Sequence, residues 1–399
     1  MKSNLYKFLI LAFFSFSCKE SEVISLEGRF SKIYNEDSFS DFVGADIQQT
    51  NDDGYLLLGA IDNSFSNQKG LPYVLKVDKA GNFLWDTKKN TFLQKFYNLI
   101  PYLKKINGEY FFFCRDNTSK AINLLKINDD TQAITSVRAY NDLNGDLVYS
   151  SQTPDGGLLL MMLSETCDAR KQPEQIKLDK NFAVQWRKCY PFFITVPIDA
   201  IDQKLNLNYF FNGTIDIEGQ QRYFITFLNQ NNTSSILFTD ENGTLLGETH
   251  TSFLINSLDQ ISGKDFAMTY IKQKDTNLVI KTALKVTEKE FLDISGNTFH
   301  EINSEKRVIT KKMTINAKEV VVFACTLENI PIRLYAFEPK SGSLKGTITL
   351  GRINPYEIAN LIQTRDGGMA IIANTLVADR FIRIALLKLS PEEVLNFIN

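Results

Sequence analysis

Histidine, tryptophan and closely spaced cysteines are scarce in this sequence. The 399 residues include two His, two Trp and five Cys. So little histidine argues against a Ser-His-Asp triad and the acyl-transfer chemistry that depends on one. The cysteines also lack the short spacings that are typical of a zinc site. The sequence therefore predicts no catalytic residue, no metal site and no cofactor.

An excess of basic residues is missing as well. There are 44 Lys and Arg against 46 Asp and Glu, a formal net charge of -2, whereas a nucleic-acid-binding protein normally carries a basic patch or stripe. DNA and RNA are therefore not expected partners. Beyond the N-terminal segment, no apolar run is long enough to form a transmembrane helix. Phe (30) and Tyr (15) are abundant, and hydrophobic residues reach 44%, which favours a sheet-rich core over disorder.

The N-terminal segment has the features of a secretory signal. Residues 1–17 (MKSNLYKFLILAFFSFS) begin with the charges of Lys2 and Lys7 and continue as an apolar run too short to span a bilayer. Cys18 follows directly. A cysteine in this place resembles the lipobox of bacterial lipoproteins, although Ser-Phe-Ser precedes it where the usual pattern has Leu, a small residue, then Gly or Ala. Ordinary cleavage after Ser17 is the alternative.

The lipobox resemblance implies a location and a partner. In that family the cysteine is acylated and becomes the mature N-terminus. Residues 1–17 would then be the signal peptide and residues 18–23 a lipidated tether. We expect a protein in the cell envelope, anchored to the outer membrane through the lipid on Cys18 and facing the periplasm or the exterior.

Internal repeats give the strongest indication of fold. Residues 47–59 (IQQTNDDGYLLLG), 151–160 (SQTPDGGLLL) and 362–372 (IQTRDGGMAII) each combine a strand, an Asp-Gly turn and an apolar strand. Weaker copies lie between them. The first apolar residue after each turn recurs about every fifty positions, which predicts seven units anchored at Tyr55, Tyr110, Leu158, Tyr209, Phe266, Val320 and Met369. Units four and five fit least well, and insertions are expected within 222–240 and 278–296.

A second repeated segment completes each unit. Residues 72–85 (PYVLKVDKAGNFLW) and 176–186 (IKLDKNFAVQW) are strand–turn–strand copies. Four short antiparallel strands per unit, A to D from the hub outward, predict an all-β propeller of seven four-stranded blades over residues 24–399. The last unit ends after its third strand, and residues 28–34 resemble the outer strands of other units. This N-terminal strand is therefore expected to complete the last blade and close the ring.

These repeats also resemble a known family. The Gln-Thr-x-Asp-Gly-Gly and Lys-x-Asp-x-x-Gly-Asn-x-x-Trp patterns are similar to those of a family of bacterial β-propeller lipoproteins and, more distantly, to quinoprotein-like propellers. The resemblance covers roughly residues 24–399. It implies a fold, and it says little about activity, because one propeller scaffold hosts many functions.

The connections from the D strand of one blade to the A strand of the next are long and aromatic, and binding sites are often found on long loops held by a rigid scaffold. If these rings are exposed, they would anchor a protein or glycan partner. The alternative is that they cap the hydrophobic ends of the blades. The candidate binding face comprises Phe92, Phe96, Tyr97, Tyr102, Tyr190, Phe192, Phe193 and Tyr356.

The remaining polar candidates favour structural roles. His250 and His300 are one repeat apart, so neighbouring blades would hold them too far from each other to share a metal. Cys114 and Cys325 fall in apolar strands and are expected to be buried thiols. Whether Cys167 and Cys189 form a disulfide is left open by the sequence.

The function is expected to be binding. The favoured hypothesis is a lipid-anchored propeller that acts as a non-enzymatic binding or scaffold protein. The alternative is a glycan hydrolase or lyase, whose two carboxylates would lie roughly 5–10 Å apart in the central funnel.

Overall fold

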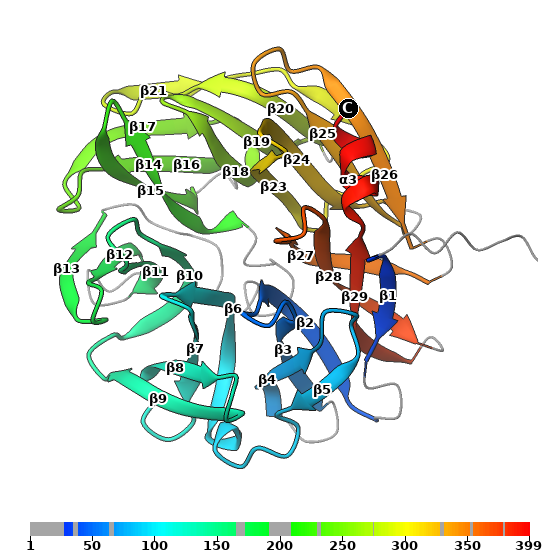
Figure 1. The fold of residues 1–399 in the computed structure, drawn as a ribbon. Helices are drawn as coiled ribbons and strands as arrows, with labels where there is room; N and C mark the ends of the chain where they lie inside the picture. The colour runs from blue at the N-terminus through cyan, green and yellow to red at the C-terminus, as the bar shows by residue number, and fades with distance from the viewer. Residues whose placement is uncertain are drawn as a thin grey trace, which may run out of the picture.

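The computed structural model describes residues 28–34, 39–63, 68–164, 172–190, 209–229, 233–273, 275–327, 331–351, 354–377 and 380–399. These residues form seven β-sheets, antiparallel except for one added parallel strand, arranged as a ring around a central opening, the predicted seven-bladed β-propeller (Figure 1). Cys18, Cys167, Phe192 and Phe193 lie outside the described residues.

Each blade has its innermost strand at the hub and its outermost strand at the rim. Blades 1 to 3 consist of β2 (Asp41–Gln49), β3 (Tyr55–Asn63), β4 (Gln68–Val77) and β5 (Phe83–Asp86); β6 (Phe96–Ile106), β7 (Glu109–Asp116), β8 (Ile122–Asn128) and β9 (Ala133–Tyr140); and β10 (Gly145–Gln152), β11 (Leu158–Ser164), β12 (Gln172–Leu178) and β13 (Val184–Cys189). A short 3-10 helix, η1 (Leu93–Lys95), precedes β6.

Blades 4 to 6 follow the same plan with one addition. They consist of β14 (Phe211–Ile217), β15 (Gln220–Leu228), β16 (Ser234–Thr239) and β17 (Leu245–Thr251); β18 (Leu254–Ser262), β19 (Asp265–Lys272), β20 (Asp275–Ala283) and β22 (Asn297–Phe299); and β23 (Val308–Ile315), β24 (Lys318–Thr326), β25 (Ile332–Phe337) and β26 (Leu344–Leu350). The addition is β21 (Lys289–Leu292), which leaves blade 5 and pairs in parallel with β17 of blade 4.

Strands from both ends of the chain form blade 7. Its inner three strands are β27 (Tyr356–Gln363), β28 (Met369–Val377) and β29 (Phe381–Leu389), and its outer strand is β1 (Phe30–Ile33). Phe30 is paired with Lys388 and Ile33 with Ala385, and Figure 1 shows β1 beside β29. Closure of the ring by the N-terminal strand, as the sequence predicted, is thus confirmed.

The chain after β29 forms an α-helix that the repeat pattern does not predict. This helix, α3 (Pro391–Ile398), starts at Ser390, whose hydroxyl accepts a hydrogen bond from Glu393 N while the Glu393 side chain accepts one from Ser390 N. Such a capping box satisfies two backbone donors at the helix start. The helix buries Val394, Phe397 and Ile398, and it packs against β26 of blade 6.

The repeat assignment was wrong in unit four. Tyr209 was taken as the first apolar residue after a turn, but it precedes β14, the inner strand of that blade. The turn lies at Glu218 and Gly219, and the second strand is β15. Residues 222–240, where an insertion was expected, contain most of β15 and all of β16. The second expected insertion, within 278–296, does contain an extra strand, β21.

The repeated Thr-x-Asp-Gly-Gly sequence forms an ion pair with a buried lysine at one face of the ring. In blade 3 the hydroxyl of Thr153 donates to Asp155, and Asp155 accepts a hydrogen bond from Gly157 N. Lys177 on β12, whose side chain is 2% exposed, places its Nζ 2.8 Å from Asp155 Oδ2. Gly156 takes a positive φ of 81°. A Cβ on Gly157 would lie 2.1 Å from the Leu178 carbonyl oxygen, so this position requires glycine.

Blades 1 and 7 repeat the arrangement. Lys76 pairs with Asp52 at 2.9 Å, and Lys388 pairs with Asp366 at 2.9 Å. Lys76 also pairs with Asp129 of blade 2, which ties two blades together. The most recognisable motif of this sequence thus has a structural role: it fixes the A–B turn of a blade to its third strand.

Candidate functional site

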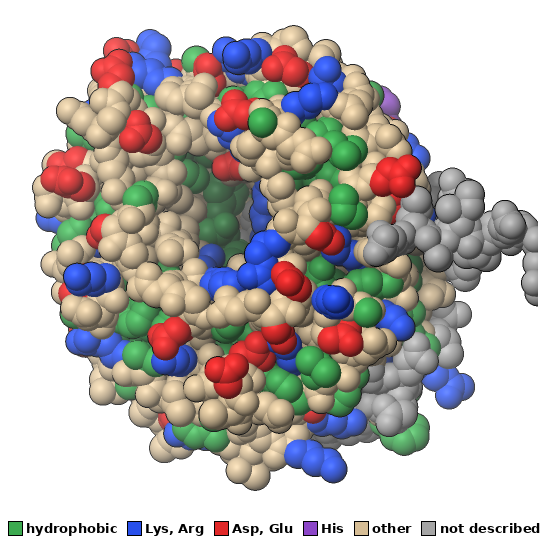
Figure 2. All heavy atoms as spheres, in the orientation of Figure 1, with side chains coloured by type: hydrophobic (Ala, Val, Ile, Leu, Met, Phe, Trp, Pro, Cys, Tyr) green, Lys and Arg blue, Asp and Glu red, His purple; other side chains and the backbone are tan. Residues whose placement is uncertain are grey.

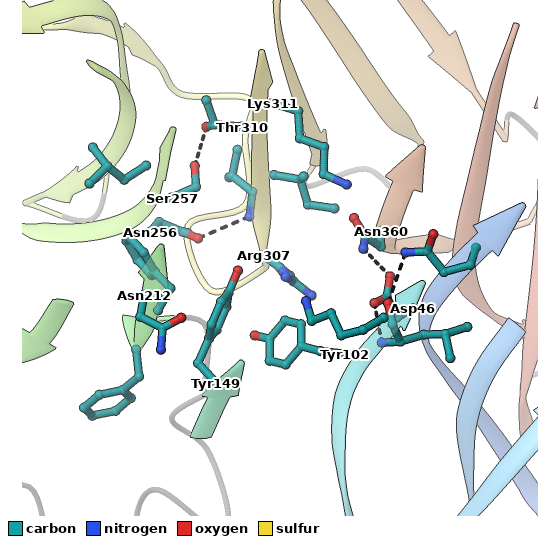
Figure 3. A pocket seen from close by; sticks show the side chains of 18 residues that line it. Asp46, Tyr102, Tyr149, Asn212, Asn256, Ser257, Arg307, Thr310, Lys311 and Asn360 are labelled. Atoms are coloured by element: carbon teal, nitrogen blue, oxygen red, sulfur yellow. Dashed lines mark hydrogen bonds between the residues drawn. The ribbon is translucent and has the colours of Figure 1, made fainter. Parts of the chain in front are cut away.

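The central opening of the ring contains a pocket of about 250 Å³. Residues from all seven inner strands, or from the positions directly before them, line its wall. Side chains on a strand alternate between its two faces, so every inner strand turns part of its sequence toward the axis. Figure 3 shows Tyr102, Tyr149 and Arg307 pointing into the space that they enclose.

Irregular pairing directs four of these side chains to the axis. The register between the first and second strands shifts by one residue just before Asp46, Tyr149, Ser257 and Asn360, in blades 1, 3, 5 and 7. All four residues line the pocket. A β-bulge changes which face a side chain occupies and is common next to functional sites. The hub is therefore shaped by backbone irregularities that the residue pattern does not reveal.

Asp46 is the one carboxylate among the described lining residues, and protein donors already satisfy it. Its Oδ1 accepts a hydrogen bond of 2.8 Å from Ile47 N, and its Oδ2 accepts one of 2.7 Å from Leu103 N. The side-chain amide of Asn360 also donates to Oδ1. Asp46 is 3% exposed. It links blades 1, 2 and 7 at the hub, and a buried carboxylate held in this way is a structural element.

Three cationic side chains face the same pocket. Arg307 Nη1 donates to the Ala359 carbonyl at 3.0 Å, and Lys311 Nζ donates to the Leu361 carbonyl at 2.6 Å. Across the described part of the chain, Lys104 Nζ has no hydrogen bond or ion pair; it lies 5.1 Å from the centre of the Tyr102 ring. Three cations against one carboxylate leave the lining with a formal charge of +2.

The surroundings oppose the charged form of the two lysines. Burial lowers the pKa of Lys104 to about 8; Asp46 opposes this shift, and the Lys311 and Arg307 charges add to it. Burial likewise lowers the pKa of Lys311, where Asp46 and Asp259 act against the shift and Arg307 acts with it. An ammonium group with too few partners gains from any anion that enters the pocket.

Aromatic rings form another part of the pocket wall. The ring centres of Tyr102 and Tyr149 are 4.1 Å apart, and Tyr149 lies 6.4 Å from Phe211. Burial raises the pKa of both tyrosines, so their hydroxyls stay protonated and can donate hydrogen bonds at neutral pH. The wall thus offers neutral donors beside the three cations.

These features define what the pocket can do chemically. The described lining offers Asp46 as its carboxyl group, so the two facing carboxylates of a glycosidase are not present in this pocket. Within the described residues, no group of three or more His, Cys, Asp and Glu is placed to hold a metal ion. The pocket is equipped to bind, through cations and neutral hydrogen-bond donors.

The structure distributes the predicted aromatic face over different environments. Phe96, Tyr190 and Tyr356 are 1%, 4% and 7% exposed, so the expectation of exposed rings was wrong for these three, and they pack inside the blades. Tyr102 is also buried, but in the wall of the central pocket. Phe92 and Tyr97 are partly exposed. Whether any of these residues binds a partner stays a prediction.

The other candidates take structural places. His250 Nε2 lies 2.7 Å from Glu248 Oε1 in blade 4, and His300 Nδ1 lies 3.0 Å from Asp275 Oδ1 in blade 5. Cys114 and Cys325 are free, buried thiols, and burial raises the pKa of Cys325 to about 12. Cys189 is disulfide-bonded.

The sequence analysis missed the charged residues of the hub. Lys104 and Lys311 each begin a Lys-Lys pair within an inner strand, in PYLKKI and ITKKMTI. A charged pair inside a strand next to the axis of a propeller is a signal that could have found both lysines. Arg307 and Asp46 carry no comparable signal.

Comparisons with known proteins identify the fold and nothing finer. No protein-family model and no curated protein matches the chain. The acylaminoacyl peptidase of Pyrococcus horikoshii matches with a TM-score of 0.52 and 11% identity over 87% of this chain. The chain spans about half of that peptidase, covering 51% of it.

Two further solved propellers show weaker similarity. The β-propeller domain of the Trilobed protease from Pyrococcus furiosus, described as having an open velcro topology, matches with a TM-score of 0.48 and 11% identity, covering 87% of this chain and 95% of that one. The Dos1 propeller matches at 0.47 and 10% identity, covering 87% and 78%. The chain is a seven-bladed β-propeller related in fold to peptidase propellers. In the described residues, no helix is both long and apolar enough to cross a membrane.

Proposed function

We propose that this protein is an exported, lipid-anchored propeller that binds a small ligand in its central pocket and leaves it chemically unchanged. The observation that carries the proposal is the Lys104 ammonium, which faces the pocket without a protein partner among the described residues. The Lys104 side chain is partly exposed to the pocket, so a ligand can reach its ammonium. An acceptor group on that ligand would then form a charge-assisted hydrogen bond with it.

The size of the pocket supports a small ligand. Its volume of about 250 Å³ lies just below the roughly 300–1,000 Å³ of typical ligand sites. A macromolecular ligand would need a larger binding surface on the exterior of the propeller. The partly exposed rings of Phe92 and Tyr97 support a protein or glycan partner at the rim as a further part of the proposal.

A pocket-filling variant tests the binding proposal. Leu258 lies on β18, lines the pocket and is partly exposed, so Leu258→Trp should occupy the space while the blade still folds. The wild-type protein should show a melting temperature that rises with at least one probe among inorganic phosphate, citrate, glucose and N-acetylglucosamine. The rise should vanish in Leu258→Trp. A response that survives this substitution would contradict binding in the pocket, as would a lack of response to every probe.

The anchor and location have a separate test. The apolar leader and the lipobox-like Cys18, together with the resemblance to bacterial propeller lipoproteins, support attachment to the outer membrane. Cys18→Ala should move the protein from the membrane fraction to the soluble envelope fraction without changing its melting temperature. Unchanged membrane association would refute the lipid anchor.

A further inference from the structure

We propose that the ligand of the central pocket is a small oxyanion, a carboxylate or a phosphate, held by Lys104, Arg307 and Lys311. This inference rests on the proposed function and adds the chemical class of the ligand. The three cations share the pocket with one carboxylate, Asp46. Asp46 is already bound by two backbone N–H groups and the Asn360 amide, and its single negative charge offsets only one of the three positive charges.

The cations are positioned before a ligand arrives. Arg307 and Lys311 are fixed by hydrogen bonds to the carbonyls of Ala359 and Leu361 in blade 7. These bonds use one donor on each side chain, whereas a guanidinium has five N–H donors and an ammonium has three. Lys104 approaches from blade 2 with its ammonium uncommitted. Charge-assisted hydrogen bonds from cations to an oxyanion are about twice as strong as neutral ones, which favours an anion over a neutral sugar.

The pocket adjoins a positively charged mouth. A neighbouring cavity of about 480 Å³ shares Gln48 and Lys311 with the pocket and is also lined by Lys105, Lys312 and Arg365, with no carboxylate in its described lining. Lys312 and Arg365 pair with Glu319 and Asp53, which are not part of that lining. Figure 2 shows Lys and Arg side chains at the edge of the central opening. A cleft of one charge sign concentrates ligands of the opposite sign.

The mouth lies on the face that carries the A–B turns, because Arg365 belongs to the turn between β27 and β28. The sequence analysis placed function on the opposite face, where the long connections lie. The buried ion pairs that fix three of these turns leave their backbone rigid, and a rigid frame suits a ring of cations that must hold its geometry.

Titration calorimetry on the purified full-length protein tests this inference. The titrants are inorganic phosphate, citrate and N-acetylglucosamine at pH 7, with ionic strength matched by sodium chloride. Phosphate or citrate should bind with a stoichiometry of one, and comparing the two separates a phosphate from a carboxylate preference. Lys104→Met and Lys311→Met should each weaken that binding at least tenfold. Lys89→Met, which changes an exposed lysine outside the pocket, should leave it unchanged.

Folding is checked on the same variants. Ligand-free Lys104→Met should melt at or above the wild-type temperature, because Lys104 makes no hydrogen bond or ion pair with the described residues and is repelled by Lys311 and Arg307; loss of binding then cannot come from unfolding. Anion binding that is insensitive to Lys104→Met and Lys311→Met would overturn the inference. If N-acetylglucosamine binds, loses its affinity in Leu258→Trp, and neither anion binds, the binding pocket stands and the anion inference fails. If Leu258→Trp alters no binding at all, both fail.

Discussion

Lys177 and Asp155 form an ion pair of which solvent reaches only one member. The ammonium of Lys177 is 2.8 Å from Asp155 Oδ2, the lysine side chain is 2% exposed, and the aspartate side chain is 46% exposed. Lys177 also donates to the Leu178 carbonyl at 2.8 Å. Lys177 thus connects the third strand of blade 3 to its A–B turn. The carboxylate of Asp155 compensates the positive charge that Lys177 carries inside the protein.

Replacing Asp155 should lower the free energy of unfolding by more than is usual for a side chain that is 46% exposed. In Asp155→Ala the buried ammonium of Lys177 loses its counter-charge and keeps the Leu178 carbonyl as an acceptor, and the loss of hydrogen bonds to a buried charged donor costs about 1–3 kcal/mol. Urea unfolding followed by tryptophan fluorescence measures the loss. Asp130→Ala is the matched control, since Asp130 is exposed in the neighbouring blade. Equal stability of the two variants would mean that the ion pair contributes nothing.

The ion pairs Lys76–Asp52, Lys177–Asp155 and Lys388–Asp366 also predict that the protein loses stability in acid. Burial opposes the shift, but hydrogen bonds from Thr50 and Lys76 and the Lys76 charge lower the pKa of Asp52 to about 2. The pKa values of Asp155 and Asp366 are lowered for the same reasons, by Lys177 and Lys388. The unfolded carboxyl titrates near pH 4, so this stabilisation is complete above about pH 4 and is lost as the pH falls toward 2.

The measurement is the free energy of unfolding between pH 5 and 2.5. A variant with Asp52→Asn, Asp155→Asn and Asp366→Asn should be less stable at pH 5 and should lose less stability on acidification than the wild type. Parallel curves for the two proteins would contradict the assignment of the acid dependence to these turns.

Closure of the ring depends on the first described strand. Tyr34 donates its hydroxyl to the Gly81 carbonyl at 2.9 Å, and it is 7% exposed. The Phe30 ring lies over the same turn, 2.5 Å from where a Cβ on Gly81 would be. A protein that begins at residue 37 should therefore lose about 3–5 kcal/mol, the cost of deleting one large buried aromatic ring, and should aggregate through the edge of β29. A protein that begins at residue 28 is the control, and identical melting of both would refute closure by β1.

Two rings from the predicted binding face should now behave differently. Tyr356 is buried within the cluster that joins blades 6 and 7, so Tyr356→Ala should lower stability by about 3–5 kcal/mol. Tyr97 is partly exposed beside the Lys120 ammonium, 5.1 Å from its ring centre, so Tyr97→Ala should cost less than about 1 kcal/mol. Thermal unfolding of Tyr356→Ala and Tyr97→Ala measures both losses of stability. A large loss for Tyr97→Ala would mean that the Tyr97 ring supports the fold and is not an exposed anchor.

The central pocket should bind anions less well at alkaline pH. Burial lowers the pKa of Lys104 to about 8, and the groups around it are Asp46, Lys311, Arg307 and the Tyr102 ring. Above pH 8 the ligand-free lysine becomes neutral, and the affinity for phosphate or citrate should fall between pH 7 and 9.

The same titration has an opposite effect on the stability of the ligand-free protein. The folded pKa lies below the unfolded value of about 10.4, so the unfolded state binds more protons between pH 8 and 10, and Lys104 makes stability rise over that range. The rise should be smaller in Lys104→Met. If the affinity for phosphate or citrate stays constant up to pH 9, Lys104 is excluded as a charged contact of the ligand.

The sequence predicted the ring because blades repeat a short-range pattern. Turn residues such as Gly156 and apolar strands such as Leu158–Ser164 report their own local geometry, and one copy supports the next. Even so, the fourth anchor at Tyr209 was misassigned, because Tyr209, Phe210 and the first residue of β14, Phe211, resemble the start of a second strand. Strand β21 was outside any such prediction, since it pairs with a strand of the preceding blade.

The candidate site was not predictable in the same way. Its members come from all seven blades, and their convergence depends on register shifts such as the one before Asp46. That Lys104 has no hydrogen-bond or ion-pair partner among the described residues can be known only from the folded structure. Tyr102 was chosen as an exposed anchor and instead lines the pocket. Short-range sequence patterns predict which residues form strands. Which side chains meet at the hub depends on how all seven blades close into the ring.

The pairing of β1 with β29 has a consequence for biosynthesis. The two strands lie far apart in the sequence, and Phe30 pairs with Lys388. Strand β1 therefore cannot pair until β29 has been synthesised. Contacts between such distant segments form slowly. Until then blade 7 presents the unpaired edge of β29, the kind of surface on which chains aggregate. The interval between the completion of β29 and its pairing with β1 is therefore the stage at which a nascent chain most needs a chaperone, and refolding from urea should slow as protein concentration rises.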